Sequence, residues 1–199
     1  MNIREFLKAL GRALATVVML PALASYYVKA LILGRDRALE SSTQALSLLP
    51  GVVGQYLRRA FLARTLDYCA PSAIIEFGTL FSSTGTRIGD RVYIGPRCHI
   101  GLAHFERDVL VGSAVHVPSG RHTHGTTDLS KPIREQEGQR EVVRIGAGSW
   151  IGNAAVVMAD VGQNTIVGAG AVVTKPLPDH VVAGGVPARV LRTREPHPE

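Results

Sequence analysis

The chain has 199 residues, 46% of them hydrophobic, and a formal net charge of +6. This length fits one domain, or one domain with an appendage. Two cysteines are too few for a scaffold held together by disulfides, so we expect a reducing compartment. The first 70 residues hold nine Lys and Arg against four Asp and Glu, so most of the excess charge lies on an apolar segment. A nucleic-acid binder concentrates its charge on a folded domain with exposed aromatics, so no nucleic-acid partner is expected. A basic and apolar segment instead indicates a membrane surface with anionic lipid.

The most apolar segment runs from 13 to 33, with Lys29 as its only charge. It is close to the roughly 20 residues that span a bilayer, and Pro21 within it should kink or break a helix. Three arrangements fit: one tilted spanning helix, a re-entrant hairpin bent at Pro21, or a helix in the membrane interface. A cleavable signal peptide fits less well, because the apolar run continues past the small residues of 22–24.

Two further helices are predicted over 37–49 and 52–66, separated by Pro50-Gly51. Residues 1–69 are therefore predicted to be an α-helical region that attaches to a membrane through residues 1–66. The alternative is that these helices only cap the open end of the next domain. Three arginines supply charge on the second of these helices, Arg58, Arg59 and Arg64, and three tyrosines suit the depth of lipid headgroups, Tyr26, Tyr27 and Tyr56.

A six-residue repeat extends from Ile88 to Val173. A large residue leads each unit, usually followed by glycine, and a small or β-branched residue comes four positions after the lead. This period predicts a parallel β-helix of four or five coils, stable only through stacking, with glycines supplying positive φ at the turns. A β-sandwich would instead need alternation with period two. The clearest lead pairs are Ile88-Gly89, Ile94-Gly95, Ile100-Gly101, Val111-Gly112, Ile145-Gly146, Ile151-Gly152 and Val167-Gly168.

The repeat resembles the left-handed β-helix of the hexapeptide-repeat acyltransferases, and the handedness rests on that resemblance. The expected fold is mainly β: a left-handed parallel β-helix over 70–192, with a loop excursion over 118–143 and a tail over 193–199. Cys98 falls at a small inward position, and Cys69 precedes the repeat.

The excursion carries His122 and His124 on a polar loop bounded by glycine. Histidine is the commonest general base near neutral pH, so both are candidate catalytic residues. In the galactoside- and maltose-type acetyltransferases, which this sequence resembles, the catalytic histidine lies five residues after the last lead residue. Counted from Val117 that position is His122, whereas the streptogramin-type offset of seven selects His124. The sequence keeps both open.

The segment after the loop is similar to that of the acetyl-CoA-dependent members of the family. The resemblance implies that Trp150 lines the thioester end, that Asn153 and Ala169 contact the pantetheine arm, and that Gly168 also belongs to the cofactor site. It places Thr174, Lys175 and Arg189 toward the nucleotide and its phosphates. Gly168 alone also fits an ordinary turn. The resemblance further implies a homotrimer with its sites at subunit boundaries, and no metal.

The string over 132–136, Pro-Ile-Arg-Glu-Gln, is similar to one in the acetyltransferases of bacterial surface-polysaccharide clusters. We therefore expect an acetyl-CoA-dependent O-acetyltransferase acting on a membrane-associated glycan or lipid-linked sugar, at the cytoplasmic face of a bacterial inner membrane. Its acceptor pocket should lie between the loop and residues 102–104. Alternatives are an N-acetyltransferase of an amino-sugar, a non-catalytic scaffold, and a γ-carbonic-anhydrase-like metalloenzyme using His99 and His104. The sequence leaves the acceptor and the length of the acyl group open.

Overall fold

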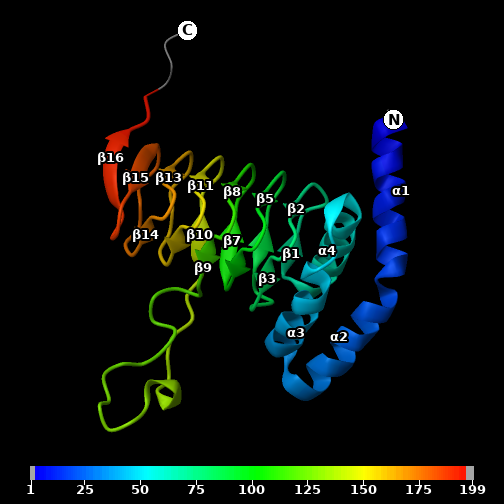
Figure 1. Ribbon diagram of the computed structural model, residues 1–199, viewed down its shortest axis with the longest axis horizontal. Coiled ribbons are helices and arrows are strands. Elements are labelled where there is room, and N and C mark those ends of the chain that lie inside the picture. The colour runs from blue at the N-terminus through cyan, green and yellow to red at the C-terminus, as the bar shows by residue number, and fades with distance from the viewer. Residues whose placement is uncertain (1–2, 196–199) are drawn as a thin grey trace.

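Four helices precede a β-helix in the computed structural model, which describes residues 3–195 (Figure 1). They are α1 (Ile3–Val18), α2 (Leu20–Leu33), α3 (Arg35–Ser47) and α4 (Gly51–Thr65), so the two helices predicted after the apolar segment are confirmed. α1 ends just before Met19, two residues ahead of Pro21, and the two helices are bent by 49° at this break. No single helix in the described chain is long and apolar enough to cross a membrane, whereas α1 and α2 together meet that test by length and composition.

The β-helix has three sheets, one along each side, and its coils stack in register (Figure 1). Sheet A contains β1 (Tyr68–Cys69), β4 (Arg87–Ile88), β7 (Ala103–Phe105) and β10 (Val143–Ile145), and single bridges at Val161 and Leu177 extend it. Sheet B contains β2 (Ile74–Ile75), β5 (Tyr93–Ile94), β8 (Leu110–Val111), β11 (Trp150–Ile151), β13 (Ile166–Val167), β15 (Val181–Gly184) and the antiparallel β16 (Arg189–Thr193). Sheet C contains β3 (Leu80–Phe81), β6 (His99–Ile100), β9 (His116–Val117), β12 (Val156–Val157) and β14 (Val172–Val173).

The β-helix begins one coil earlier than the sequence repeat indicates. Cys69, Ile75 and Phe81 point into a first coil whose strands pair with those of the coil led by Ile88. The stack therefore has about six turns instead of four or five. The predicted domain already began at residue 70, but the repeat was read only from Ile88, because glycine does not follow the lead residues of the first coil and seven positions separate Phe81 from Ile88. At the other end β16 reaches Thr193, and residues 196–199 of the predicted tail lie outside the described chain.

The residues that the repeat predicts to point inward are buried in the structure. Every lead residue from Ile88 to Val173 is at most 2% exposed, and Cys98 fills a small position as predicted. Burying each such aliphatic side chain contributes about 1.5–3 kcal/mol. The two polar small residues, Ser149 and Thr165, donate their hydroxyls to the carbonyls of Gly162 and Pro178, each at 2.7 Å.

The repeat glycines have a different role from the one predicted. A Cβ on Gly95 would lie 2.7 Å from both the carbonyl carbon and the oxygen of Gly112 in the next coil. Glycine therefore follows the lead residue because neighbouring coils approach there, and φ is not the reason. Positive φ occurs instead three positions after the lead, mostly at other residues: Arg91, Arg97, Asp108, Ala114, Ala154, Asn164 and His180.

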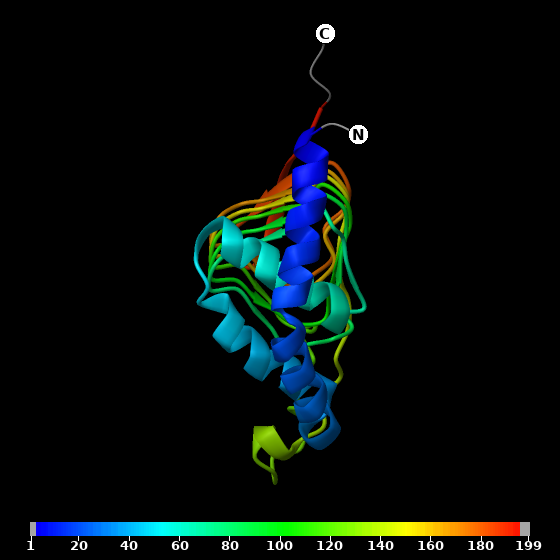
Figure 2. The ribbon, with the colours of Figure 1, turned by 90° about the vertical axis from the view of Figure 1, so that its right-hand side faces the viewer.

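The helices close the first coil of the β-helix (Figure 2), as the capping alternative required. Tyr26 is fully buried edge-on against Phe61, with ring centroids 5.7 Å apart, so its predicted position at headgroup depth is wrong. Arg58 and Arg59 are also buried rather than surface charges, at 3% and 8% exposure. The burial of Arg58 has a structural reason, because its Nε donates to the carbonyl of Ile75 at 3.0 Å and ties α4 to the first coil.

The outward surface of α1 is apolar, the reverse of a helix on the surface of a soluble domain. Its polar residues Glu5, Lys8 and Arg12 line a hollow against the rest of the protein. α2 continues the apolar surface, with Leu31 89% exposed. The outward side chains of α1, at spacings of three and four, are Ile3, Phe6, Leu7, Leu10, Leu14, Val17 and Val18.

Candidate active site

The loop excursion leaves after β9 and returns at β10, with a short 3₁₀ helix, η1 (Ile133–Glu135), near its tip (Figure 1). Its stem is fixed by backbone hydrogen bonds from Glu141 N to Ser119 O at 2.9 Å and from Gln139 N to His122 O at 2.7 Å. The Ser119 hydroxyl accepts a hydrogen bond from Leu102 N at 2.9 Å, which anchors the stem to the coil below. The histidine-bearing segment is therefore held in place at its base.

The far part of the loop is closed by Gln136, the last residue of the Pro-Ile-Arg-Glu-Gln string. Its side chain accepts a hydrogen bond from Asp128 N at 3.1 Å and donates to Asp128 O at 2.7 Å. The Asp128 carboxylate accepts hydrogen bonds from the hydroxyl and backbone N–H of Ser130, and these bonds lower the pKa of Asp128. The string thus has a structural role in shaping the loop.

His124 lines a hollow of about 470 Å³ between the loop and sheet C. His99 and His116 face it from neighbouring coils, with ring centroids 6.1 Å apart. Arg140 closes another side and pairs with Asp36 of α3 at 3.1 Å. Three imidazoles and a guanidinium around an open space suit a hydroxylated ligand, because they offer several hydrogen-bonding groups.

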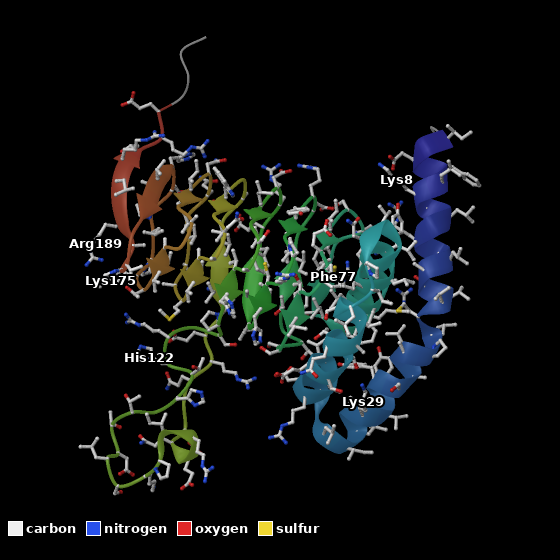
Figure 3. The ribbon with its side chains drawn as sticks, in the orientation of Figure 1. Lys8, Lys29, Phe77, His122, Lys175 and Arg189 are labelled. Atoms are coloured by element: carbon white, nitrogen blue, oxygen red, sulfur yellow. The ribbon has the colours of Figure 1, made fainter. Side chains whose placement is uncertain are left out.

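His122 has a different environment. Both histidines are exposed, but His122 is absent from the lining of the hollow and accepts a hydrogen bond at Nε2 from Arg121 Nε at 3.0 Å. The same guanidinium donates through Nη1 to the carbonyl of Thr174 at 3.3 Å. Figure 3 shows His122 on the side of the β-helix where Lys175 and Arg189 lie. The two loop histidines therefore do not share one position around the hollow.

The predicted cofactor residues fall into two groups. Thr174 and Lys175 follow β14, and a hydrogen bond from Ala188 N to Val172 O at 2.8 Å brings Arg189 beside that strand. Arg121 contacts both His122 and Thr174, and Figure 3 shows Lys175 and Arg189 on the same side of the β-helix as His122.

The second group lies at the corner between sheets B and C. Asn153 and Ala169 occupy equivalent turns of successive coils there, and Gly168 comes just before Ala169. Asn153 Oδ1 accepts a hydrogen bond from Ser113 N at 2.9 Å, so this side chain also supports the stack. Trp150, 48% exposed, faces outward from sheet B. A single chain therefore does not gather all the predicted residues into one cavity.

Trp150 belongs to a column that the sequence prediction missed. The residue just before each lead residue of sheet B faces outward and pairs in register with its counterparts in adjacent coils. The column runs along the parallel strands of the sheet from β2 to β15, and the signal in the sequence was an apolar residue before every third lead position. Its members are Ile74, Tyr93, Leu110, Trp150, Ile166 and Val182.

Two other candidate sites are not assembled. Ala103 is fully buried, and His104 faces outward from sheet A with its Nε2 3.2 Å from Gly85 O, so residues 102–104 do not line the hollow. His99 lies on sheet C, which separates it from His104. Within residues 3–195 no three His, Cys, Asp or Glu side chains are grouped to hold a metal ion. Burial raises the pKa of Cys69 to about 12 and of Cys98 to about 11, which makes both thiols poor nucleophiles.

A β-helix of six-residue units with a histidine-bearing loop at one corner defines the architecture of the hexapeptide-repeat acyltransferases. No family model matches the chain. The galactoside O-acetyltransferase of Escherichia coli K12 is 48% identical over 163 residues, which cover 71% of this chain and 80% of the relative. The chain therefore belongs to the hexapeptide-repeat acetyltransferases, a family of enzymes.

Other similarities are shorter or concern the fold alone. WbbJ of Escherichia coli K12, named for O-acetyl transfer in lipopolysaccharide biosynthesis, is 28% identical over 124 residues, 58% of this chain and 61% of that protein. The matched part of the chain covers only 37% to 61% of the length of several of these relatives. A galactoside acetyltransferase solved in complex with coenzyme A superposes with a TM-score of 0.67 at 23% identity, over 80% of this chain and 81% of that one.

Proposed function

We propose that this protein is an acetyl-CoA-dependent O-acetyltransferase that acetylates a hydroxyl group of a sugar. The observation that carries the proposal is the hollow beside the loop, where His124 faces His99 and His116 of sheet C. The galactoside O-acetyltransferase relative supports a sugar acceptor, and the lipopolysaccharide-related WbbJ supports a glycan.

His124 is the general base in this proposal. It lines the hollow, and the histidine rings that form hydrogen bonds within the described chain are those of His104 and His122. A neutral imidazole nitrogen takes the proton of the acceptor hydroxyl as the oxygen attacks the thioester carbonyl. The carbon–sulfur bond then breaks, and the imidazolium returns the proton to the leaving thiolate. His122, whose Nε2 is held by Arg121, has a positioning role.

The residues near β14 fit the donor. Lys175 and Arg189 are exposed cations on one side of the molecule (Figure 3), and cations of this kind bind phosphates. At the corner between sheets B and C, a Cβ on Gly170 would meet nothing within 4 Å. Small residues at an open corner let a thin pantetheine arm approach the backbone.

A homotrimer would unite the two groups of site residues. The outward column of sheet B is apolar from Ile74 to Val182, which suits burial against another subunit. Packing it against sheet C of the neighbour would bring Trp150 of one subunit to the His124 hollow of the next. Sedimentation of the Leu110→Lys variant tests this arrangement, because a buried lysine should dissociate the trimer, whereas an unchanged sedimentation coefficient would contradict it.

The acceptor is proposed to be membrane-associated, because α1 and α2 expose a continuous apolar surface. On this proposal the two helices lie in one leaflet at the cytoplasmic face of a bacterial inner membrane. Replacing Leu10 and Leu14 together with glutamate should abolish flotation with lipid vesicles. Leu129→Glu is the matched control, because Leu129 is 97% exposed but lies in the loop. Equal flotation of both variants would contradict the attachment.

The test of acyl transfer combines calorimetry with kinetics. We expect acetyl-CoA to bind wild type, His122→Ala and His124→Ala with similar affinity. With p-nitrophenyl galactoside as acceptor, His124→Ala should lower kcat by about 10²- to 10⁴-fold, and His122→Ala by less. With glucosamine as a second acceptor, an alkali-labile ester product would indicate O-acetylation and an alkali-stable amide N-acetylation. Absence of acetyl-CoA binding by wild type would refute the proposed activity, and a larger loss in His122→Ala would reassign the base.

A further inference from the structure

A second hollow lies at the opposite end of the molecule from β16. It has a volume of about 440 Å³ and is enclosed by α1, α4 and the first coils of the β-helix; we call it the α1–α4 pocket. Lys8 and Arg12 of α1, Arg59 of α4 and Arg91 of the β-helix line it, together with one carboxylate, Glu5. Figure 3 places Lys8 on the side of α1 that faces the β-helix. The pocket shares no lining residue with the hollow around His124.

The positive charge of this pocket is only partly compensated. Glu5 pairs with Lys8 at 2.9 Å, and Arg91 pairs with Asp108 at 2.6 Å. Within residues 3–195 no such carboxylate pairs with Arg12 or Arg59. Two guanidinium groups without an acidic partner at one hollow form a site for an anion.

Arg59 shows that the anion site is built into the fold. The residue is 8% exposed, and its buried Nε has no hydrogen-bond partner among the described residues. Burial lowers the pKa of the Arg59 guanidinium, and the nearby positive charge of Arg12 lowers it further. A buried donor without a hydrogen-bond partner costs free energy, and more so when it belongs to a charged group. An anion in the pocket would remove that cost by accepting hydrogen bonds from the guanidinium.

The position of the pocket indicates which kind of molecule bears the anionic group. It lies on the polar face of α1, whose other face exposes Phe6, Leu10 and Leu14. A helix with its side chains is about 10–12 Å across, so lipid chains beside the apolar face bring their headgroups to the level of the pocket. A phosphate carries two or more acceptor oxygens, which match the two guanidinium groups.

We propose that the α1–α4 pocket binds the phosphate group of a membrane lipid whose chains lie along the apolar face of α1. The proposal rests on the proposed membrane attachment but is independent of acyl transfer. It assigns to Arg12 and Arg59 the recognition of a headgroup, and to the pocket a role in orienting the protein on an anionic surface.

The test uses the full chain in a non-ionic detergent, stripped of lipid, with short-chain probes that need no bilayer. Dihexanoyl phosphatidic acid should bind by calorimetry, whereas dihexanoyl phosphatidylcholine and inorganic phosphate should bind at least about tenfold more weakly. Arg12→Gln should weaken phosphatidic acid binding at least about tenfold, because it removes charge-assisted hydrogen bonds. Arg64→Gln, an exposed arginine of α4 outside the pocket, is the control and should stay within about twofold.

Three results would overturn the proposal. They are no binding of phosphatidic acid, equal losses in Arg12→Gln and Arg64→Gln, and inorganic phosphate binding as tightly as the lipid. Because the probes need neither a vesicle nor acetyl-CoA, failure here would leave the flotation and acyl-transfer experiments to be judged separately. Thermal unfolding of Arg12→Gln checks that the variant is folded.

Discussion

The close backbone approach at Gly95 gives a sharp stability prediction. In Gly95→Ala the new methyl would lie 2.7 Å from the carbonyl carbon and oxygen of Gly112 and 2.9 Å from Val111 O. Normal contacts are about 3.5–4.0 Å, and all three atoms belong to backbone that cannot rotate away. Relieving the clash requires the second and third coils to separate locally, which weakens the ladder between β5 and β8.

Such overpacking lowers the free energy of unfolding by about 1–3 kcal/mol. Alanine also reduces the conformational entropy of the unfolded chain, which offsets about 0.4–1 kcal/mol of this loss. We therefore expect a net loss of about 1–2 kcal/mol in the free energy of unfolding. The midpoint of thermal unfolding should fall by about 2–8 °C, at about 2–4 °C per kcal/mol for a chain of this size.

The matched control is Gly184→Ala. A Cβ at Gly184 would meet only Leu191 Cδ1, at 3.4 Å, and that side chain can move. Its unfolding midpoint, followed by circular dichroism, should stay within about 2 °C of wild type. An unchanged or raised midpoint for Gly95→Ala would refute the explanation that glycine follows the lead residue to admit the neighbouring coil.

Other predictions concern charge and burial. Because burial raises the pKa values of Cys69 and Cys98 from 9.0, the unfolded chain loses their protons first, and the free energy of unfolding should fall as pH rises above about 9. In the Cys69→Ala/Cys98→Ala variant, the free energy of unfolding measured by urea titration should fall less steeply with pH. The same slope as in wild type would contradict the effect of burial on the two thiols. Arg140→Ala should cost less than about 1 kcal/mol of stability, because its pair with Asp36 is exposed, yet raise the KM for the acceptor. Arg134→Ala, outside the hollow, should leave that KM unchanged. Arg58→Met should lower the free energy of unfolding by about 2–3 kcal/mol, because buried carbonyls lose their donor, whereas an effect as small as that of Arg64→Met would count against this role.

The six-residue repeat is sufficient to predict most of the β-helix. Period six forces one large and one small inward residue per unit, and strands of such units can bury those residues only by stacking. The burial of Ile94, Cys98 and Thr165 follows directly from their place in the period. The repeat units of the first coil were not recognised, although the predicted domain included most of it, because its inward residues Cys69 and Phe81 are not followed by glycine.

The sequence by itself therefore determined the architecture, the position of the loop and the identity of its two histidines, because these follow from local periodicity and its interruption. Only the tertiary structure decided that His124 faces the hollow while His122 is held by Arg121, since side-chain direction on a loop depends on its stem contacts. It also decided that Arg58 and Arg59 are buried. The sequence predicts that Arg58 and Arg59 belong to α4. Their burial follows only from the packing of α4 against α1 and the first coil.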